Sequence, residues 1–292
     1  MARQVYVAEN AGFCFGVQRA VNTTLYENQK KSSKVFTLGP LIHNDDVVKN
    51  LAEQGISQIS TEDIERLGPE DALVIRSHGV TPEIFERIMK TGAKIIDATC
   101  PYVASIQRKA RKYYEEGYQI VIVGDPNHPE VIGINGCCNN TAIITRNGDE
   151  LNNLPDRVCI LSQTTERQSN FEKTREIVSK KCKDMLAFNT ICSATRERQD
   201  SAEQISKTVD LMIVIGGRHS SNTKKLYEVC SANCKTLLIE NKQELPDWVR
   251  TDLQLERIGV TAGASTPDWI IDEIVDIISL IADDRVIQEE SD

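Results

Sequence analysis

The stretch Ala11-Gly-Phe-Cys-Phe-Gly-Val-Gln-Arg-Ala20 places Cys14 on a glycine-flanked turn at the start of a predicted helix. Comparable turns recur at Asp97-Ala-Thr-Cys-Pro101 and at Thr190-Ile-Cys-Ser-Ala-Thr195. In each case an apolar, strand-like run precedes the cysteine and a long helical pattern follows it. We predict that these three cysteines meet at one point and hold an iron–sulfur cluster.

The whole chain has the composition of an ordinary globular protein. Its 292 residues suffice for two or three compact units, and 40% are hydrophobic and 26% charged. The net charge of −9 argues against a nucleic acid or an anionic membrane surface as a partner. The apolar stretch 269–282 contains three acidic residues, so it predicts an amphipathic helix and not a membrane span.

The cysteine count indicates the compartment. Nine cysteines occur without a signal peptide, which disfavours a disulfide framework and favours a reducing, cytoplasmic location. The chain ends soon after its last predicted helix, so we expect no fused extra domain. We interpret the remaining cysteines as small buried or surface thiols.

Alignment on Cys14, Cys100 and Cys192 shows an internal repeat of alternating helices and strands. Continuous apolar runs between helices are typical of parallel strands that are covered on both faces. The predicted helices after the cysteines cover 17–29, 103–116 and 196–207, and the apolar runs that follow cover 35–39, 120–124 and 211–216. Further strands are predicted at 55–59, 141–145 and 235–239, and three more begin at 73, 158 and 258. Acidic turns that start helices are predicted at 60–63, 147–150 and 241–244. Later helices are predicted at 82–91, 168–182 and 267–282.

The last strand of each repeat leads into the next cysteine. Strands 94–96 and 185–188 do this for the first two repeats, and the N-terminal strand 3–8 would complete the third. We therefore predict an α/β fold: three similar α/β domains with mostly parallel sheets in a pseudo-threefold ring around a central iron–sulfur cluster. The predicted domains are 15–99, 100–191, and 192–284 together with 1–14.

Polar loops follow the strands of every repeat, where ligands of parallel sheets bind. Hydroxyl, amide and imidazole donors at such positions, with helix N-termini behind them, suit a phosphate or diphosphate. All four histidines lie in these loops, although a lone loop histidine is more often only a solvated side chain. The donors are His43, His78, His128, His219, Thr164, Thr165, Ser220, Ser221, Asn222 and Ser265.

Three cysteines from distant loops could bind zinc, but structural zinc sites usually have four ligands with short pairwise spacing. A 4Fe-4S cluster with three thiolate ligands would leave one iron open as a Lewis acid and would supply single electrons. With a diphosphate pocket, this suggests reductive removal of a hydroxyl group. Glu130 is the best candidate proton donor, and the alternative is an acid that complements its helix macrodipole.

Seven motifs of this chain, spread from Val5 to Ala282, resemble those of the LytB family, the 4-hydroxy-3-methylbut-2-enyl diphosphate reductases of the non-mevalonate isoprenoid pathway. The motifs are Gly12–Arg19, Ser77–Val80, Asp97–Pro101, His128–Glu130, Gln163–Thr165, Ser220–Asn222 and Thr261–Ser265. The resemblance implies one 4Fe-4S cluster per chain on Cys14, Cys100 and Cys192, with the substrate hydroxyl on its fourth iron.

The resemblance also implies the roles of the loop residues. Glu130 would deliver a proton, Thr164 would assist near the hydroxyl, and the products would be isopentenyl and dimethylallyl diphosphate. The diphosphate would be held by His43, His78, His128, Ser220, Ser221, Asn222 and Ser265. His219 falls where no required family histidine is expected, and Cys137 and Cys138 have no functional interpretation.

Two other functions remain open at this level. One is a quinolinate-synthase-like enzyme with a three-cysteine cluster, although such an enzyme should use arginines to bind carboxylates. The other is a redox sensor without catalysis, which would not need so polar a cavity. The basic run Gln107–Lys112 suggests docking of a ferredoxin or flavodoxin-type electron donor, against the simpler interpretation of a solvated helix face.

Overall fold

The computed structural model describes residues 3–252 and 254–289. The chain divides into two compact units. The terminal unit comprises Met1–Cys14, His43–Val47 and Ser193–Asp292, and the central unit comprises Phe15–Ile42 and Val48–Cys192. Two of the three predicted domains therefore fall largely within one unit, and the three domain boundaries stay a prediction.

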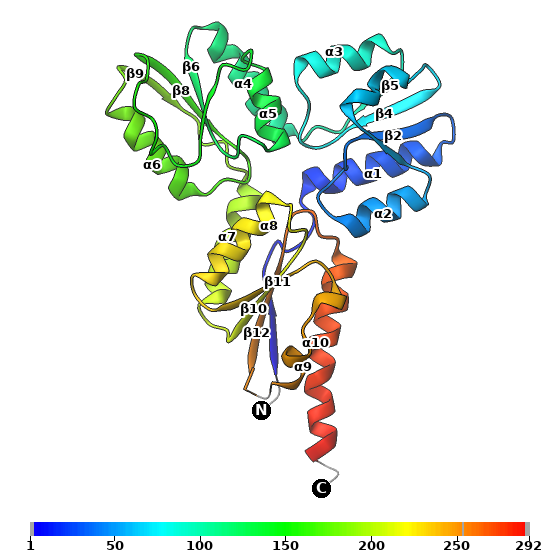
Figure 1. The fold of residues 1–292 in the computed structure, drawn as a ribbon. Coiled ribbons are helices and arrows are strands. Elements are labelled where there is room, and N and C mark those ends of the chain that lie inside the picture. The colour runs from blue at the N-terminus through cyan, green and yellow to red at the C-terminus, as the bar shows by residue number, and fades with distance from the viewer. Residues whose placement is uncertain (1–2, 253, 290–292) are drawn as a thin grey trace. The chain divides into compact units, whose positions relative to one another are not determined.

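Three four-stranded sheets form the framework, and every strand pairing in them is parallel (Figure 1). The sheets confirm the predicted α/β fold class with parallel sheets. One sheet has the order β3-β2-β4-β5, with strands Ser57–Ile59, Lys34–Leu38, Asp71–Ile75 and Lys94–Asp97. A second has the order β7-β6-β8-β9, with strands Ile143–Thr145, Gln119–Val123, Arg157–Ser162 and Asp184–Ala187.

The third sheet lies in the terminal unit and has the order β1-β12-β10-β11, with strands Gln4–Val7, Arg257–Ala262, Leu211–Ile215 and Lys235–Ile239. The N-terminal strand β1 pairs in parallel with β12, so that Gln4 lies opposite Arg257. The prediction that the first strand completes the last sheet is confirmed.

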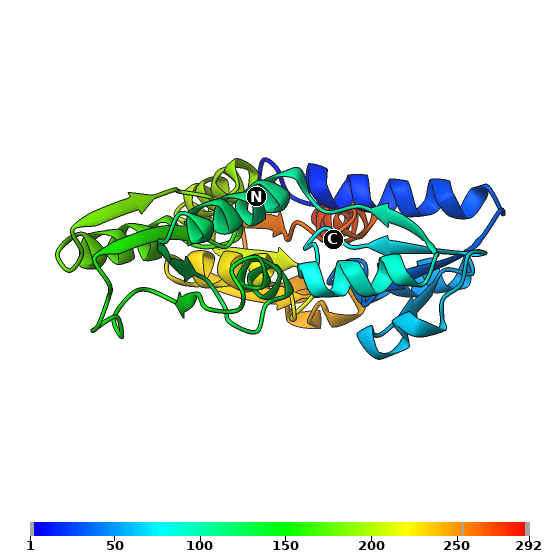
Figure 2. The ribbon, with the colours of Figure 1, turned by 90° about the horizontal axis from the view of Figure 1, so that it is seen from above.

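The helices connect these strands and cover both faces of the sheets. In the central unit they are α1 Phe15–Gln29, α3 Pro82–Lys90, α4 Pro101–Glu115, α5 Pro129–Gly136, α6 Gln168–Ser179 and the 3-10 helix η1 Thr61–Arg66. The terminal unit contains α7 Ser193–Ser206, α8 Ser221–Ser231, η2 Lys242–Glu244, α9 Asp247–Thr251 and α10 Asp268–Glu289, and α2 Asp45–Glu53 runs from one unit into the other. Figure 2 shows α1 (blue) running along its sheet.

Side-chain alternation along β10 shows how a continuous apolar run is buried on both faces. Ile213 and Ile215 pack on one face with Ile270 and Ile274 of α10. Met212 and Val214 point to the other face and pack with residues of α7 and α8, including Ala202 and Leu226. A strand of this kind needs apolar side chains at every position, which is why its sequence is not alternating.

One predicted helix start is wrong. The acidic turns at 60–63 and 241–244 precede or enter the 3-10 helices η1 and η2, but no helix forms at Asn147–Glu150. Gly148 there has a φ of 84°, outside the right-handed helical region, and its N–H donates to Thr145 Oγ1 over 2.7 Å. The turn is fixed by this side-chain bond in place of a helical one.

Among the described residues, no helix combines the length and the apolar character needed to cross a membrane.

Candidate active site

Each predicted cluster cysteine stands directly before a helix. Cys14 precedes α1, Cys100 is the N-cap residue of α4, and Cys192 precedes α7. Their thiols are partly exposed, and no disulfide is formed among the described residues.

Each of the three cysteine turns makes the same kind of backbone hydrogen bond, from the cysteine N–H to a backbone oxygen beyond a neighbouring strand. The N–H of Cys14 donates to Ala264 O over 3.3 Å, that of Cys100 to Ser77 O over 2.9 Å, and that of Cys192 to Thr164 O over 3.0 Å. Each acceptor lies just past the neighbouring strand, β12, β4 or β8. The repeat predicted from the sequence is therefore present in the local geometry of the three turns.

Two arginines that the sequence interpretation missed hold cysteine turns in place. Arg198 of α7 is 2% exposed and donates to Asn10 O and Gly12 O over 2.7 and 3.0 Å. Arg19 of α1 donates to Thr99 O over 3.1 Å, in the turn that precedes Cys100. Both stand in the second turn of a helix that follows a cysteine, and this shared position is the signal that could have identified them.

His78 and His128 come together in the central unit. Their ring centroids are 5.1 Å apart and the rings meet edge to face at 83°. His128 is the N-cap residue of α5, and its Nδ1 accepts a hydrogen bond from the N–H of Glu130 over 3.2 Å. Because Nδ1 is the acceptor, the neutral ring carries its proton on Nε2, where it can be donated to a ligand.

Glu130 lies in the first turn of α5 and is only 2% exposed. Its Oε1 accepts a hydrogen bond from the N–H of Thr164, and its Oε2 accepts one from the Thr164 hydroxyl, both over 2.6 Å. A carboxylate that only complemented the helix macrodipole would not need bonds from a second loop. The structure thus brings together the predicted proton donor and the threonine expected to assist it.

The loop around Thr164 is itself fixed by Gln163, which is fully buried. The Gln163 side chain accepts from the N–H of Asp125 over 3.1 Å and donates to Thr165 Oγ1 over 3.0 Å. The bond with Asp125 ties the loop after β8 to the loop after β6, and the bond with Thr165 fixes the loop after β8 itself. Because α5 follows the latter loop, Gln163 helps to hold Glu130 and Thr164 in register.

The terminal unit presents Ser220, Ser221 and Asn222 at the start of α8. Ser220 is the N-cap residue, and its hydroxyl accepts from the N–H of Thr223 over 3.3 Å. Asn222 is 3% exposed, and neither its amide nitrogen nor its amide oxygen has a hydrogen-bond partner among the described residues. A buried amide without partners is costly, so this side chain is arranged for a ligand.

His43 and Ser265 are joined in the same unit. The Ser265 hydroxyl donates to the backbone oxygen of His43 over 3.1 Å. A Cβ on Gly217 would lie 2.4 Å from the same oxygen, so only glycine permits this approach of the His43 loop to the end of β10. His219, which we left out of the predicted site, is exposed.

The predicted site residues are divided between the two units. The terminal unit holds Cys14, His43, Ser220, Ser221, Asn222 and Ser265, and the central unit holds Cys100, Cys192, His78, His128, Glu130 and Thr164. The meeting of all three cysteines on one cofactor therefore stays a prediction. Within each unit, the predicted residues occupy equivalent strand-end loops.

The fold and these side chains define an α/β protein of three parallel sheets, with cysteine turns before helices and hydrogen-bond donors at its strand ends. The family described as "LytB protein" matches residues 5–279. The chain belongs to the LytB family. An iron–sulfur cofactor is consistent with this family, and the chain offers several candidate ligand residues.

Relatives of known name agree with this assignment. A 4-hydroxy-3-methylbut-2-enyl diphosphate reductase of Clostridium perfringens (strain SM101 / Type A) is 51% identical over 276 residues, which are 94% of this chain and 98% of that protein. A protein of the same name from Clostridium tetani is 54% identical over 273 residues, 93% of this chain, but the chain spans only 43% of its length.

Solved structures show the same fold. A structure titled (E)-4-hydroxy-3-methyl-but-2-enyl diphosphate reductase, the terminal enzyme of the non-mevalonate pathway, is 41% identical, with a TM-score of 0.68, over 95% of this chain and 99% of its own. The E-1-hydroxy-2-methyl-but-2-enyl-4-diphosphate reductase from Plasmodium falciparum is 28% identical, with a TM-score of 0.87, over 95% of this chain and 88% of its own.

Proposed function

We propose that this protein is a 4-hydroxy-3-methylbut-2-enyl diphosphate reductase. It removes the hydroxyl group of (E)-4-hydroxy-3-methylbut-2-enyl diphosphate reductively and yields isopentenyl and dimethylallyl diphosphate. Membership of the LytB family supports the reaction class. The observation that carries the assignment within this chain is the buried Glu130 carboxylate, bonded twice to Thr164 and placed two residues after His128.

The diphosphate is held by imidazole, hydroxyl and amide donors. Asn222 offers a buried amide with no partner among the described residues, and His128 directs its Nδ1 to the backbone, so that Nε2 serves the ligand. Donors of this kind bind phosphate oxygens well, especially at helix N-termini. The full set proposed for the diphosphate is His43, His78, His128, Ser220, Ser221, Asn222 and Ser265.

Cys14, Cys100 and Cys192 would hold one 4Fe-4S cluster per chain. The remaining thiols fit this role poorly, because burial raises the pKa of Cys138 to about 11 and those of Cys159 and Cys230 to about 12. Thiols of such high pKa stay protonated, whereas ligation requires thiolates. When bound, the cluster supplies single electrons and a Lewis-acidic iron with an open position.

In its protonated form, Glu130 donates the proton that the departing hydroxyl group requires. Hydroxide is a poor leaving group, so general acid catalysis is needed at this step. The two bonds from Thr164 fix both carboxyl oxygens, and the burial of Glu130 keeps bulk water from competing for its proton. Thr164 positions the acid near the hydroxyl group of the substrate.

The electrons come from a ferredoxin or flavodoxin-type carrier in the cytoplasm. On α4, the side chains of Arg108, Arg111 and Lys112 are exposed and form a basic surface in an acidic protein. Such a surface attracts an acidic carrier protein. A reducing compartment is also what nine cysteines without a disulfide among the described residues require.

The assignment is tested with protein prepared anaerobically. Mössbauer and EPR spectroscopy should show one four-iron cluster per chain, and its signal should be lost in the Cys14→Ser, Cys100→Ser and Cys192→Ser variants. Dithionite with a mediator should then drive conversion of the hydroxylated diphosphate. An intact cluster without turnover would contradict the reductase assignment, and an unchanged signal in any one variant would remove that cysteine from the ligand set.

A further inference from the structure

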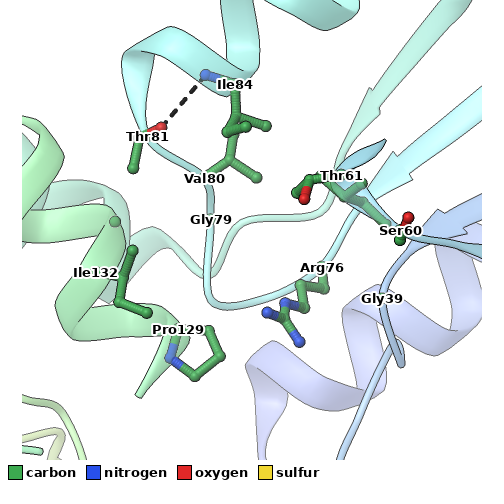
Figure 3. Close-up of a pocket in the computed structure, with 12 residues that line it drawn as sticks. Gly39, Ser60, Thr61, Arg76, Gly79, Val80, Thr81, Ile84, Pro129 and Ile132 are labelled. Carbon is green, nitrogen blue, oxygen red and sulfur yellow. Dashed lines mark hydrogen bonds between the residues drawn. The ribbon is translucent and has the colours of Figure 1, made fainter. Parts of the chain in front are cut away.

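A cavity of about 250 Å³ lies in the central unit, beside the loop that runs from Arg76 to Thr81 (Figure 3). Its walls come from the ends of β2 and β4, the starts of η1 and α3, and the first turns of α5. The residues that the proposed function uses do not line it. The lining is Leu38, Gly39, Ser60, Thr61, Arg76, Gly79, Val80, Thr81, Ile84, Pro129, Ile132 and Gly133.

Arg76 is the charged group of this cavity. Figure 3 shows its guanidinium group directed into the space between Pro129 and Gly39. Among the side chains that the structure describes, no acidic group forms an ion pair with Arg76, and the Arg76 side chain makes no hydrogen bond to a described residue. Burial lowers its pKa and no neighbouring acid opposes this shift, although an arginine stays protonated in proteins.

The setting of Arg76 differs from that of two nearby arginines, Arg66 at the end of η1 and Arg87 of α3. Arg66 is paired with Asp63 over 2.6 Å, and Arg87 with Glu65 over 2.7 Å. A partly buried guanidinium without an anion loses hydration and gains no charge partner in return. A bound anion would supply that partner, and the planar guanidinium is well suited to two oxygens of one phosphate.

The rest of the cavity is mostly apolar. Val80 and Ile84 of the α3 region face Pro129 and Ile132 of α5, and Ile132 is 47% exposed although it is a large apolar residue. Thr81 adds a hydroxyl group that accepts from the N–H of Ile84 over 3.3 Å and keeps its own hydrogen for a ligand. The cavity is smaller than the ~300–1,000 Å³ of sites for drug-sized ligands, so its occupant must be small.

We propose that this cavity is a second ligand site, which binds a small phosphorylated compound with a short apolar group. Arg76 binds the phosphate, and Val80, Ile84 and Ile132 contact the apolar group. The proposal rests on the proposed function only for the choice of probe, because the substrate and products of that reaction are phosphorylated compounds with a short apolar group. The ligand chemistry itself follows from the cavity.

A molecule in this cavity would contact residues next to two histidines that are proposed to bind the diphosphate. Gly79 follows His78, and Pro129 follows His128. The loop and α5 are closely packed here, since a Cβ on Gly136 would lie 2.6 Å from Thr81 Cγ2. The second site is therefore adjacent to His78 and His128 of the proposed active site, but different side chains line it.

Equilibrium dialysis of the cluster-reconstituted full chain with radiolabelled isopentenyl diphosphate tests the proposal. The protein should bind two molecules per chain, and Arg76→Met should weaken one of the two sites about tenfold to a hundredfold. Arg76→Lys, which keeps the charge without the planar fork, should give an intermediate affinity. Arg66→Met is the matched control, because it removes an exposed arginine at the end of η1 that does not line the cavity, and it should leave both sites unchanged.

The two kinds of contact are separated by the choice of probe. Inorganic diphosphate should bind the second site more weakly than isopentenyl diphosphate, and isopentenol should not bind it. Asn222→Ala should weaken the other binding event about tenfold and leave the Arg76-dependent one unchanged. Binding of isopentenyl diphosphate that neither Arg76 variant weakens would overturn the proposal, whether one or two molecules bind per chain. Turnover by the unaltered protein decides the proposed function independently of this result.

Discussion

Thr164 donates two hydrogen bonds to Glu130, one from its backbone N–H and one from its hydroxyl group, each over 2.6 Å. Thr164 follows β8, and Glu130 lies in the first turn of α5, the helix that comes after the adjacent strand β6 of the same sheet. Because one of the bonds comes from the backbone, no substitution of Thr164 except proline removes it. The carboxyl group therefore keeps its place in most variants, so its chemistry can be changed without moving it.

Glu130→Gln should lower turnover by about a hundredfold or more, because the amide has no acidic proton to donate. Its oxygen can still accept from the Thr164 N–H, so the fold, the cluster and substrate binding should be retained. Dithionite-driven kcat, an EPR spectrum and a substrate Kd measure these three properties. Glu172→Gln, on the surface of α6, is the control. Near-normal turnover of Glu130→Gln would show that another group is the acid.

Thr164→Val should lower kcat about tenfold, since it removes the hydroxyl bond to Oε2 and keeps the backbone bond to Oε1. Thr164→Ser should restore most of the activity because serine retains the donor. The two variants are compared by kcat and KM under the same reductant. If serine were as slow as valine, packing of the methyl group and not the hydroxyl bond would explain the effect.

Asn222→Ala should weaken substrate binding and leave the free protein no less stable. The amide is buried without a partner among the described residues, so its removal costs no protein–protein hydrogen bond. We expect KM to rise about tenfold while Tm is unchanged or higher. Asn233→Ala is the contrasting variant, because Asn233 donates to Ser206 Oγ and Val229 O and should lose stability without a change in KM. A large loss of Tm in Asn222→Ala would assign Asn222 a structural role.

Strand and helix positions could be predicted because local patterns determine them. The continuous apolar runs at β6 and β10 exclude an exposed face, and each cysteine turn stands between such a run and a helix. The pairing of β1 with β12 followed from a missing strand in the third repeat. His78 and His128 were predicted to lie close together because both follow strands of the repeats, and their ring centroids are 5.1 Å apart.

Other features depend on contacts that no local pattern contains. Arg198 reads as a surface residue of a polar helix, yet it is buried because two backbone oxygens of a distant turn accept its bonds. Arg76 likewise reads as an ordinary strand-end arginine, and only the cavity shows that it lacks an acid partner among the described residues. The Asn147–Glu150 turn has the composition of a helix start, but the positive φ of Gly148 decides against it.

Glu27 should make the stability of the protein pH-dependent. The hydrogen bond from Lys94, helped by Lys30, lowers the pKa of this buried carboxyl, and desolvation only partly opposes it. A carboxyl whose pKa is lower in the folded state stabilises the fold above its unfolded value of ~4.3 and loses this contribution as the pH falls through the folded value.

Glu27→Gln should therefore cost about 1 kcal/mol at pH 7, a modest amount because both lysines are half exposed. The difference from the unaltered protein should vanish at acid pH, below the folded pKa. Urea unfolding of both proteins between pH 7 and pH 3 measures the difference in free energy of unfolding and its decrease toward acid pH. Glu203→Gln, which breaks the exposed pair with Lys207, should show neither effect. A constant difference at all pH values would mean that Glu27 acts by packing and not by charge.

Charge reversal on α4 should separate carrier docking from the chemistry of the site. Arg108 and Lys112 are exposed, whereas Arg111 contacts the thiol of Cys137 and is left in place. Arg108→Glu combined with Lys112→Glu should slow turnover driven by ferredoxin or flavodoxin about tenfold at low salt, and the effect should shrink as salt is added. Dithionite-driven turnover should not change, because a small reductant needs no docking surface.

Lys180→Glu combined with Lys183→Glu, which alters two exposed lysines just after α6, is the matched control. Equal slowing with both reductants would mean that the substitutions disturb the site itself, and an unchanged carrier-driven rate would leave α4 as a solvated helix face.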